Sequence, residues 1–152
     1  MVTEQTKSTK FSDIKREWHL IDVGDKTLGR ISTRISTLLM GKNKPYFVRN
    51  LDCGDYVVVI NASLVKTTGG KELKKKYYRY SGYPGGLTIE TLEKLRLRRP
   101  EEVVRHSVSG MLPQNRLRDR MLARLFIFPK ESHTYQDKFK IKVGKPKTEE
   151  KK

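Results

Sequence analysis

The sequence has little cysteine and no long hydrophobic run, and each shortage excludes a class of protein. Cys53 is the only cysteine among 152 residues, so an intramolecular disulfide is impossible, a thiolate metal cluster is disfavoured and a reducing compartment fits. No apolar run approaches the roughly 20 residues that cross a bilayer. Residues 1–15 lack a hydrophobic signal region, and Glu4 and Asp13 argue against a mitochondrial-type presequence. We therefore expect a cytoplasmic protein that makes no membrane contact.

Acidic residues are also scarce relative to basic ones. The chain has 33 Lys and Arg against 17 Asp and Glu, which gives a formal net charge of +16. The excess is spread along the chain, and such a field favours a polyanionic partner. Because no segment pairs a basic face with a long apolar face, a membrane surface is a poor candidate. Nucleic acid is the favoured partner.

Length and composition predict one folded domain with polar extensions. Residues 1–16 lack hydrophobic periodicity and are expected to form a mobile N-terminal arm. Residues 17–128 carry the apolar patterns of a single α/β domain. Residues 129–152 are polar and basic, and we expect a C-terminal tail with extended character at 138–143.

Hydrophobic periodicity predicts that the domain opens with a strand, a turn and a helix. We expect a strand at 18–23, then a helix that Thr27 caps and that ends near Met40, with Gly41 as its C-cap. Residues 56–60 are β-branched and apolar on both faces, which is typical of a central parallel strand. The later elements are expected to be a helical turn at 62–65, a short helix within 87–99 capped by Thr88 or Thr91, a helix from Pro100 that stops at Gly110, a helix opened by Pro113, and a strand at 126–128.

The stretch from Lys74 to Leu87 combines cations, tyrosines and turn-forming glycines, and it predicts a surface for RNA. Cations neutralise phosphates and release counterions, while tyrosine rings offer flat faces to bases and riboses. A solvated hairpin with half-buried tyrosines is the competing interpretation. In an extended strand Tyr78 and Tyr80 would share one face, and Tyr77 and Arg79 the other. We expect Arg79 to mark the RNA side.

The segment from Gly24 to Arg30 has the glycine spacing of a phosphate-binding loop between a strand and a helix. A nucleotide-binding loop needs Lys followed by Ser or Thr after its last glycine, but Arg30 and Ile31 stand there. We therefore do not expect nucleotide hydrolysis. The start of the helix together with Arg30 can still hold an RNA phosphate.

Other candidate catalytic or metal-binding residues lack a supporting pattern. His19, His106 and His133 are far apart, and none has metal-ligand spacing with another His or Cys. Asp52 and Asp55 could form a carboxylate pair, but a polar loop before a strand explains them equally well. We expect no cofactor, no metal and no catalysed reaction.

Several motifs, in this order along the chain, resemble those of the bacterial-type large-subunit ribosomal protein L13 family. They cover most of the chain, and together they are highly specific. The matching stretches are Trp18 to Arg30, Gly54 to Ala62, Lys76 to Arg79, Ser81 to Leu87, Arg99 to Val104, and Gly110 to Pro113. Two positions depart from the family pattern: Tyr80 stands where the family often has His, and Arg118 where Gly commonly occurs.

This resemblance implies a three-layer α/β/α domain around a small, largely parallel, four-stranded sheet. It also implies a structural constituent of the large ribosomal subunit that binds large-subunit rRNA early in assembly and contacts neighbouring ribosomal proteins. No small-molecule substrate and no obligate homo-oligomer are expected. The alternative is a free-standing RNA-binding translational regulator, including one that binds its own mRNA.

The candidate RNA-binding residues lie in the Lys74 to Leu87 stretch and on cation-bearing segments elsewhere. They are Arg30, Lys42, Lys44, Arg49, Lys71, Lys74, Lys75, Lys76, Tyr77, Tyr78, Arg79, Tyr80, Ser81, Gly82, Tyr83, Arg116, Arg118, Arg120 and Arg124.

Overall fold

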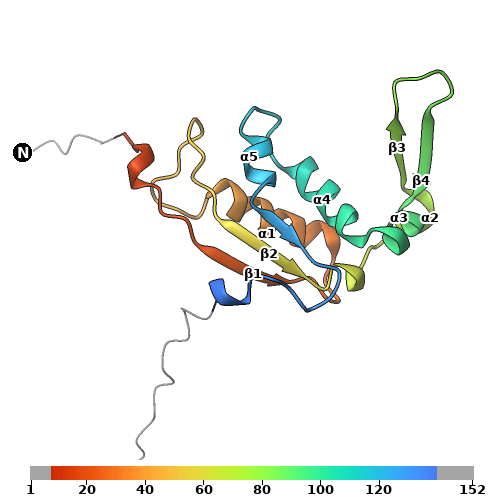
Figure 1. The fold of residues 1–152 in the computed structure, drawn as a ribbon, viewed down its shortest axis with the longest axis horizontal. Helices are drawn as coiled ribbons and strands as arrows, with labels where there is room; N and C mark the ends of the chain where they lie inside the picture. Colours follow the sequence, from red (N-terminus) through yellow and green to blue (C-terminus); the bar gives the residue numbers. More distant parts are fainter. Residues whose placement is uncertain (1–7, 140–152) are drawn as a thin grey trace, which may run out of the picture.

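The computed structural model describes residues 8–139, which form a mixed α/β fold with a parallel sheet and a separate antiparallel hairpin (Figure 1). In chain order the elements are η1 (Phe11–Asp13), β1 (Trp18–Asp22), α1 (Leu28–Met40), β2 (Tyr56–Ile60), η2 (Ala62–Leu64), α2 (Lys71–Lys74), β3 (Lys76–Tyr80), β4 (Leu87–Thr91), α3 (Leu92–Arg98), α4 (Pro100–Met111), α5 (Arg118–Leu122), β5 (Leu125–Ile127) and η3 (Gln136–Lys138). Residues 1–7 and 140–152 are not described, so most of the predicted extended piece at 138–143 lies outside the described residues.

The opening strand and helix form as predicted. Helix α1 ends where Gly41 adopts a left-handed conformation with φ of 77°, and its N–H donates to the carbonyls of Thr37 and Leu38. Thr27 precedes the helix, but its side chain makes no capping hydrogen bond. Instead, the N–H of Leu28 donates to the carbonyl of Lys66 at 2.9 Å, because Thr27 forms a parallel bridge with that residue.

The parallel sheet has the strand order β1-β2-β5, with β2 in the centre as predicted. Residues 57–60 of β2 are buried, which agrees with their continuous apolar character. The expected fourth strand does not join this sheet in the described part of the chain, since β3 and β4 pair with each other instead. The parallel arrangement is confirmed, and the strand number is corrected to three for residues 8–139.

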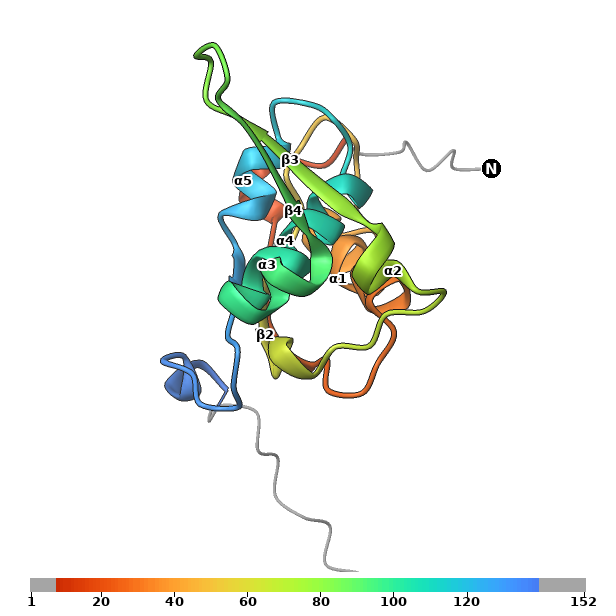
Figure 2. The same cartoon turned by 90° about the vertical axis from the view of Figure 1, so that its right-hand side faces the viewer.

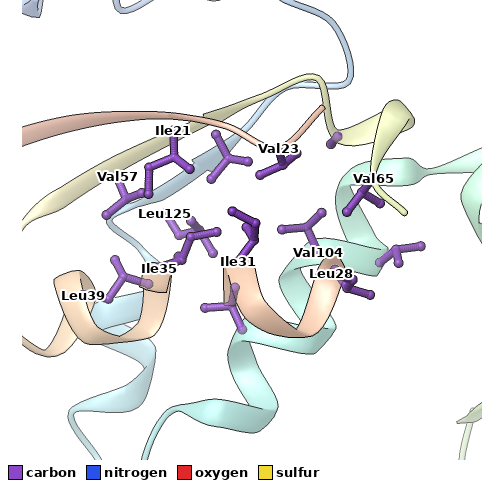
Figure 3. Packing of buried hydrophobic residues seen from close by; sticks show 14 of the residues in the cluster. Ile21, Val23, Leu28, Ile31, Ile35, Leu39, Val57, Val65, Val104 and Leu125 are labelled. Atoms are coloured by element: carbon purple, nitrogen blue, oxygen red, sulfur yellow. The ribbon is translucent and has the colours of Figure 1, made fainter. Parts of the chain in front are cut away.

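Helices α1 and α4 pack on one face of the sheet and form the main core (Figure 3). Figure 3 shows Ile31 and Ile35 of α1 pointing toward Ile21, Val57 and Leu125 of the three strands, while Val104 comes from α4. This cluster contains most of the buried apolar side chains of the described residues, and burial of apolar surface stabilises a fold by about 25 cal/mol per Å². The core therefore holds α1 and α4 in a fixed position on the sheet.

The opposite face of the sheet carries an aromatic cluster. The ring of Trp18 stacks on Tyr56 with centroids 4.5 Å apart, and Tyr135 packs on Phe126 at 4.4 Å. Trp18 also contacts Tyr135, with centroids 5.3 Å apart. Residues after β5 thus cover part of this face. The coarse α/β class is confirmed, but within residues 8–139 aromatic side chains lie where a second helical layer was expected.

The short helix expected within 87–99 is confirmed as α3, and of the two proposed caps it is Thr91 whose side chain accepts from the N–H of Lys94. The residues before it, 87–91, form strand β4 by pairing with β3. Two other predicted boundaries differ in the structure. Helix α4 continues past Gly110 and ends at Met111. Pro113 does not open a helix: the side chain of Asn115 accepts from the N–H of Leu117 and forms a turn before α5.

No helix in the described part is long and apolar enough to cross a membrane.

We expect Gly54→Ala to destabilise the fold strongly. A Cβ at this position would overlap the carbonyl oxygen of Leu39 at the end of α1 and press on Arg124. The unfolding free energy should fall by at least about 3 kcal/mol in urea titrations. Gly29→Ala is the matched control, because a Cβ there meets open space on α1 and should add about 0.5 to 1 kcal/mol. Equal stability of Gly54→Ala and wild type would contradict the close approach.

Candidate nucleic-acid interface

The predicted RNA-binding stretch folds mainly as a hairpin that projects from the body beyond α3 and α4 (Figures 1 and 2). Strands β3 and β4 pair antiparallel, and the turn between them is closed by a hydrogen bond from Ser81 N–H to the carbonyl of Gly86 at 3.2 Å. Lys71 and Lys74 belong to α2, which leads directly into β3. Lys74, Lys75 and Lys76 are therefore brought together with Lys71 at the base of a projecting ribbon, while Arg79 lies further along β3 toward the turn.

One face of the hairpin presents exposed apolar and aromatic side chains. Tyr78 lies opposite Ile89, and Tyr80 lies opposite Leu87. Their side chains are between 52% and 66% exposed, and Tyr83 at the tip is 75% exposed. Because successive residues of a strand point to opposite faces, these four strand side chains form one continuous patch. The patch offers ring faces to bases and apolar area to a partner.

The opposite face of the hairpin turns toward the body. Tyr77 is half-buried against the core, and its ring lies 5.3 Å from that of His106 in α4. Burial raises the pKa of Tyr77, so its hydroxyl stays protonated at neutral pH. The ammonium of Lys75 lies 5.1 Å from the centre of the same ring. Of the four tyrosines in the stretch, only Tyr77 is half-buried, as the competing interpretation of a solvated hairpin expected.

The remaining predicted cations are spread over several elements. Arg30 lies exposed in the first turn of α1, and Arg120 is exposed on α5. Lys42, Arg49 and Arg116 are also exposed, in loops. These side chains are accessible to phosphate, but they lie on elements outside the hairpin and do not form one cluster with its cations.

Lys44 is engaged in a buried network around Asp55. Its ammonium contacts the Asp55 carboxylate and donates to the carbonyls of Lys15 and Cys53 at 2.6 and 2.9 Å. The same carboxylate accepts from the backbone N–H of Glu17 and contacts His19. Burial alone would raise the pKa of Asp55, but these hydrogen bonds outweigh it and hold the pKa below its ordinary value.

Arg124 is buried and held by Asp52. Two guanidinium nitrogens contact the two carboxylate oxygens, and the Arg124 side chain is only 6% exposed. Arg16 approaches the same carboxylate from the N-terminal side at 3.5 Å. Arg118 is partly buried and donates to the hydroxyl of Ser109 in α4. The guanidinium groups of Arg124 and Arg118 are thus directed into the protein.

A cleft between the hairpin and helices α3 and α4 brings predicted residues of the hairpin together with Lys94 and Arg98, which the sequence analysis did not name. Lys94, Arg98, Arg99 and His106 line it together with Tyr77 and the predicted Arg79. The sequence pattern that could have identified Lys94 and Arg98 is their i, i+4 spacing after the Thr91 cap, which places both cations on one helix face. These two cations were not predicted from the sequence, because the cleft forms only when the hairpin stands beside α3, a tertiary arrangement that the helical spacing does not reveal.

In residues 8–139 no group of His, Cys, Asp and Glu side chains could hold a metal ion. Asp52 and Asp55 bind cations of the protein itself instead.

Comparison with known proteins decides the family. The model of the family described as ribosomal protein L13 matches residues 16–134. The chain belongs to the ribosomal protein L13 family. The large ribosomal subunit protein uL13 of Nautilia profundicola is 48% identical over 130 residues, which cover 86% of this chain and 93% of that protein. The uL13 of Clostridioides difficile is 49% identical over 127 residues, covering 83% and 88%. The family resemblance seen in the sequence is confirmed, and L13 is a family of ribosomal proteins rather than enzymes.

We expect Asp55→Asn to lower stability in a pH-dependent way. The folded-state pKa is lowered, so the carboxylate contributes stability above the unfolded-state pKa and loses it as pH falls through the folded-state value. The substitution leaves Lys44 without its buried partner and should cost about 3 kcal/mol at pH 7. Chemical unfolding of both proteins from pH 7 to pH 3 should show the difference shrinking below about pH 4. The control is Asp25→Asn in an exposed pair with Lys66, which should change little.

We expect Arg124→Gln to act on stability, whereas Arg120→Gln does not. The first substitution leaves the buried Asp52 carboxylate without its main partner and should cost about 3 to 5 kcal/mol. The second removes an exposed cation from α5 and should stay within about 0.5 kcal/mol of wild type. Thermal and urea unfolding measure both. Similar stability of the two variants would show that the Arg124 pair does not hold the fold.

Proposed function

We propose that the protein is a structural constituent of the large ribosomal subunit, located on cytoplasmic ribosomes, and that it binds large-subunit rRNA during early assembly. Membership of the L13 family supports the ribosomal role. The observation that carries the rRNA proposal is the projecting hairpin, which joins a basic base to an exposed aromatic face. No reaction and no cofactor are needed for this role.

The mechanism is electrostatic and geometric. Exposed lysines at the base of the hairpin neutralise phosphates of an rRNA segment and release counterions. The ring faces of Tyr78, Tyr80 and Tyr83 stack on bases or pack against riboses and neighbouring ribosomal proteins. Arg30, Lys42, Arg49, Arg116 and Arg120 add phosphate contacts away from the hairpin. Lys44 and Arg124 are left out of this interface, because each already holds a buried carboxylate.

Replacing Lys74, Lys75 and Lys76 by Ala tests the proposal. The triple variant should bind bacterial large-subunit rRNA more weakly than wild type. The slope of log affinity against log salt should fall by roughly one unit per lost contact. Filter binding at several salt concentrations measures this change. An unchanged slope would show that these lysines are not phosphate contacts.

A matched triple variant separates a local effect from a general one. Arg105, Lys130 and Lys138 are exposed cations outside the hairpin, so their replacement by Ala removes the same charge. This control should retain most of the affinity and most of the preference for large-subunit over small-subunit rRNA. Sucrose-gradient fractionation of cell extracts tests the ribosomal role itself. Nearly complete comigration with large subunits is expected, whereas a free-standing regulator would remain largely at the top of the gradient.

A further inference from the structure

The cleft between hairpin β3–β4 and helices α3 and α4 has a volume of about 1010 Å³. Ligand pockets in proteins usually span about 300 to 1,000 Å³, so this cleft is large enough for an extended ligand rather than a single ion. The hairpin supplies one wall through Tyr77, Arg79 and Thr88, and the two helices supply the other. Figure 2 shows the hairpin standing over α3 and α4.

The walls of the cleft carry an excess of positive charge. Arg98 is paired with Glu90 at 2.7 Å, and Arg99 with Glu102 at 3.5 Å. The arginine side chains of both pairs are more than half exposed, and because exposed ion pairs contribute little to stability, a phosphate can replace the carboxylate at small cost. Two further cations of the cleft, Arg79 and Lys94, have no ion-pair partner within residues 8–139. The cationic side chains of the cleft therefore outnumber its two acidic ones, Glu90 and Glu102, and the cleft favours binding of an anion.

Aromatic rings lie between these charges. Tyr77 and His106 both line the cleft, with ring centroids 5.3 Å apart and planes tilted by 32°. The hydroxyl of Tyr77 is buried and has no hydrogen-bond partner in the described part of the chain. Because burial raises the pKa of Tyr77, this group remains a donor at neutral pH. Cations next to ring faces are the combination that recognises single-stranded nucleic acid.

We propose that this cleft binds an unpaired strand of RNA, with phosphates on Arg79, Lys94 and Arg99 and a base or ribose against the pair formed by Tyr77 and His106. The inference rests on the proposed rRNA-binding function and names the site and the form of RNA that it takes. In a duplex the base faces are stacked and hidden, so only an unpaired strand can use the rings. An acidic peptide would match the charges but would leave the ring faces unused.

Binding of a fluorescein-labelled uridine hexamer to the full-length protein tests the cleft. Lys94→Gln combined with Arg99→Gln removes two cleft cations that lie outside the Lys74 to Leu87 stretch. Fluorescence anisotropy should show affinity lowered about tenfold and a salt slope smaller by about 1.4, which is the single-strand value for two contacts. The matched control, Arg105→Gln with Lys130→Gln, should bind nearly as wild type does. Circular dichroism and thermal unfolding establish that both variants fold.

Photocrosslinking gives a positional readout that a general charge effect would not produce. A hexamer containing 4-thiouridine should crosslink to the peptides that carry Tyr77 or His106, and mass spectrometry identifies these peptides. Crosslinks confined to residues outside the cleft would overturn the proposal. Tyr77→Phe retains the ring and removes the hydroxyl, so it should preserve most of the crosslinking and most of the hexamer affinity.

The outcomes separate this proposal from the proposed function. If wild type selects large-subunit over small-subunit rRNA but the cleft variant binds the hexamer as tightly as the control does, the cleft assignment fails alone. If wild type shows no such selection while hexamer binding still depends on the cleft, the ribosomal proposal fails and the cleft assignment stands. Cleft-dependent binding of a glutamate decapeptide that is tighter than hexamer binding would assign the cleft to an acidic protein segment and overturn the RNA proposal.

Discussion

Two buried carboxylates hold the parts of this protein together. Asp52 binds Arg124 just before β5, and Asp55 binds Lys44 and the segment before β1. Both acids lie in the short loop before the central strand, so they join the two edge strands to the centre of the sheet. A chain with a net charge of +16 repels itself. Asp52 and Asp55 offset this repulsion locally by pairing with Arg124 and Lys44. The exposed cations on the surface remain available to a polyanion.

The β3–β4 hairpin is anchored to the body that these two carboxylates hold together, but it carries the exposed surfaces proposed to bind partners. An isolated two-stranded ribbon is only marginally stable in water, and here Tyr77 anchors one side of it to α4. The outer face thereby exposes an aromatic and aliphatic patch, while the inner face carries Arg79 and Glu90 beside the anchoring Tyr77. One short element thus presents two chemically different surfaces, which suits a protein that lodges between several partners.

The sequence predicted the parts of the fold that depend on local pattern. Helix α1, its Gly41 cap and the buried strand β2 follow from periodicity and glycine conformation, and the structure confirms them. It did not predict β4, because residues 87–91 become a strand only through pairing with β3. Charge patterning identified the cation-rich segments but not the direction of each side chain. Arg124 and Arg120 are alike in sequence, yet only tertiary contacts bury the first and expose the second.

The aromatic face of the sheet gives the protein a built-in optical reporter. Trp18 is the only tryptophan, and its ring contacts Tyr56 in the neighbouring strand as well as Tyr135 and Phe139 in the segment after β5. Its fluorescence therefore responds to whether that segment lies on the sheet. Assembly into a larger particle that displaced or tightened the segment would change the emission of this one residue, so docking could be followed in the unlabelled, unsubstituted protein.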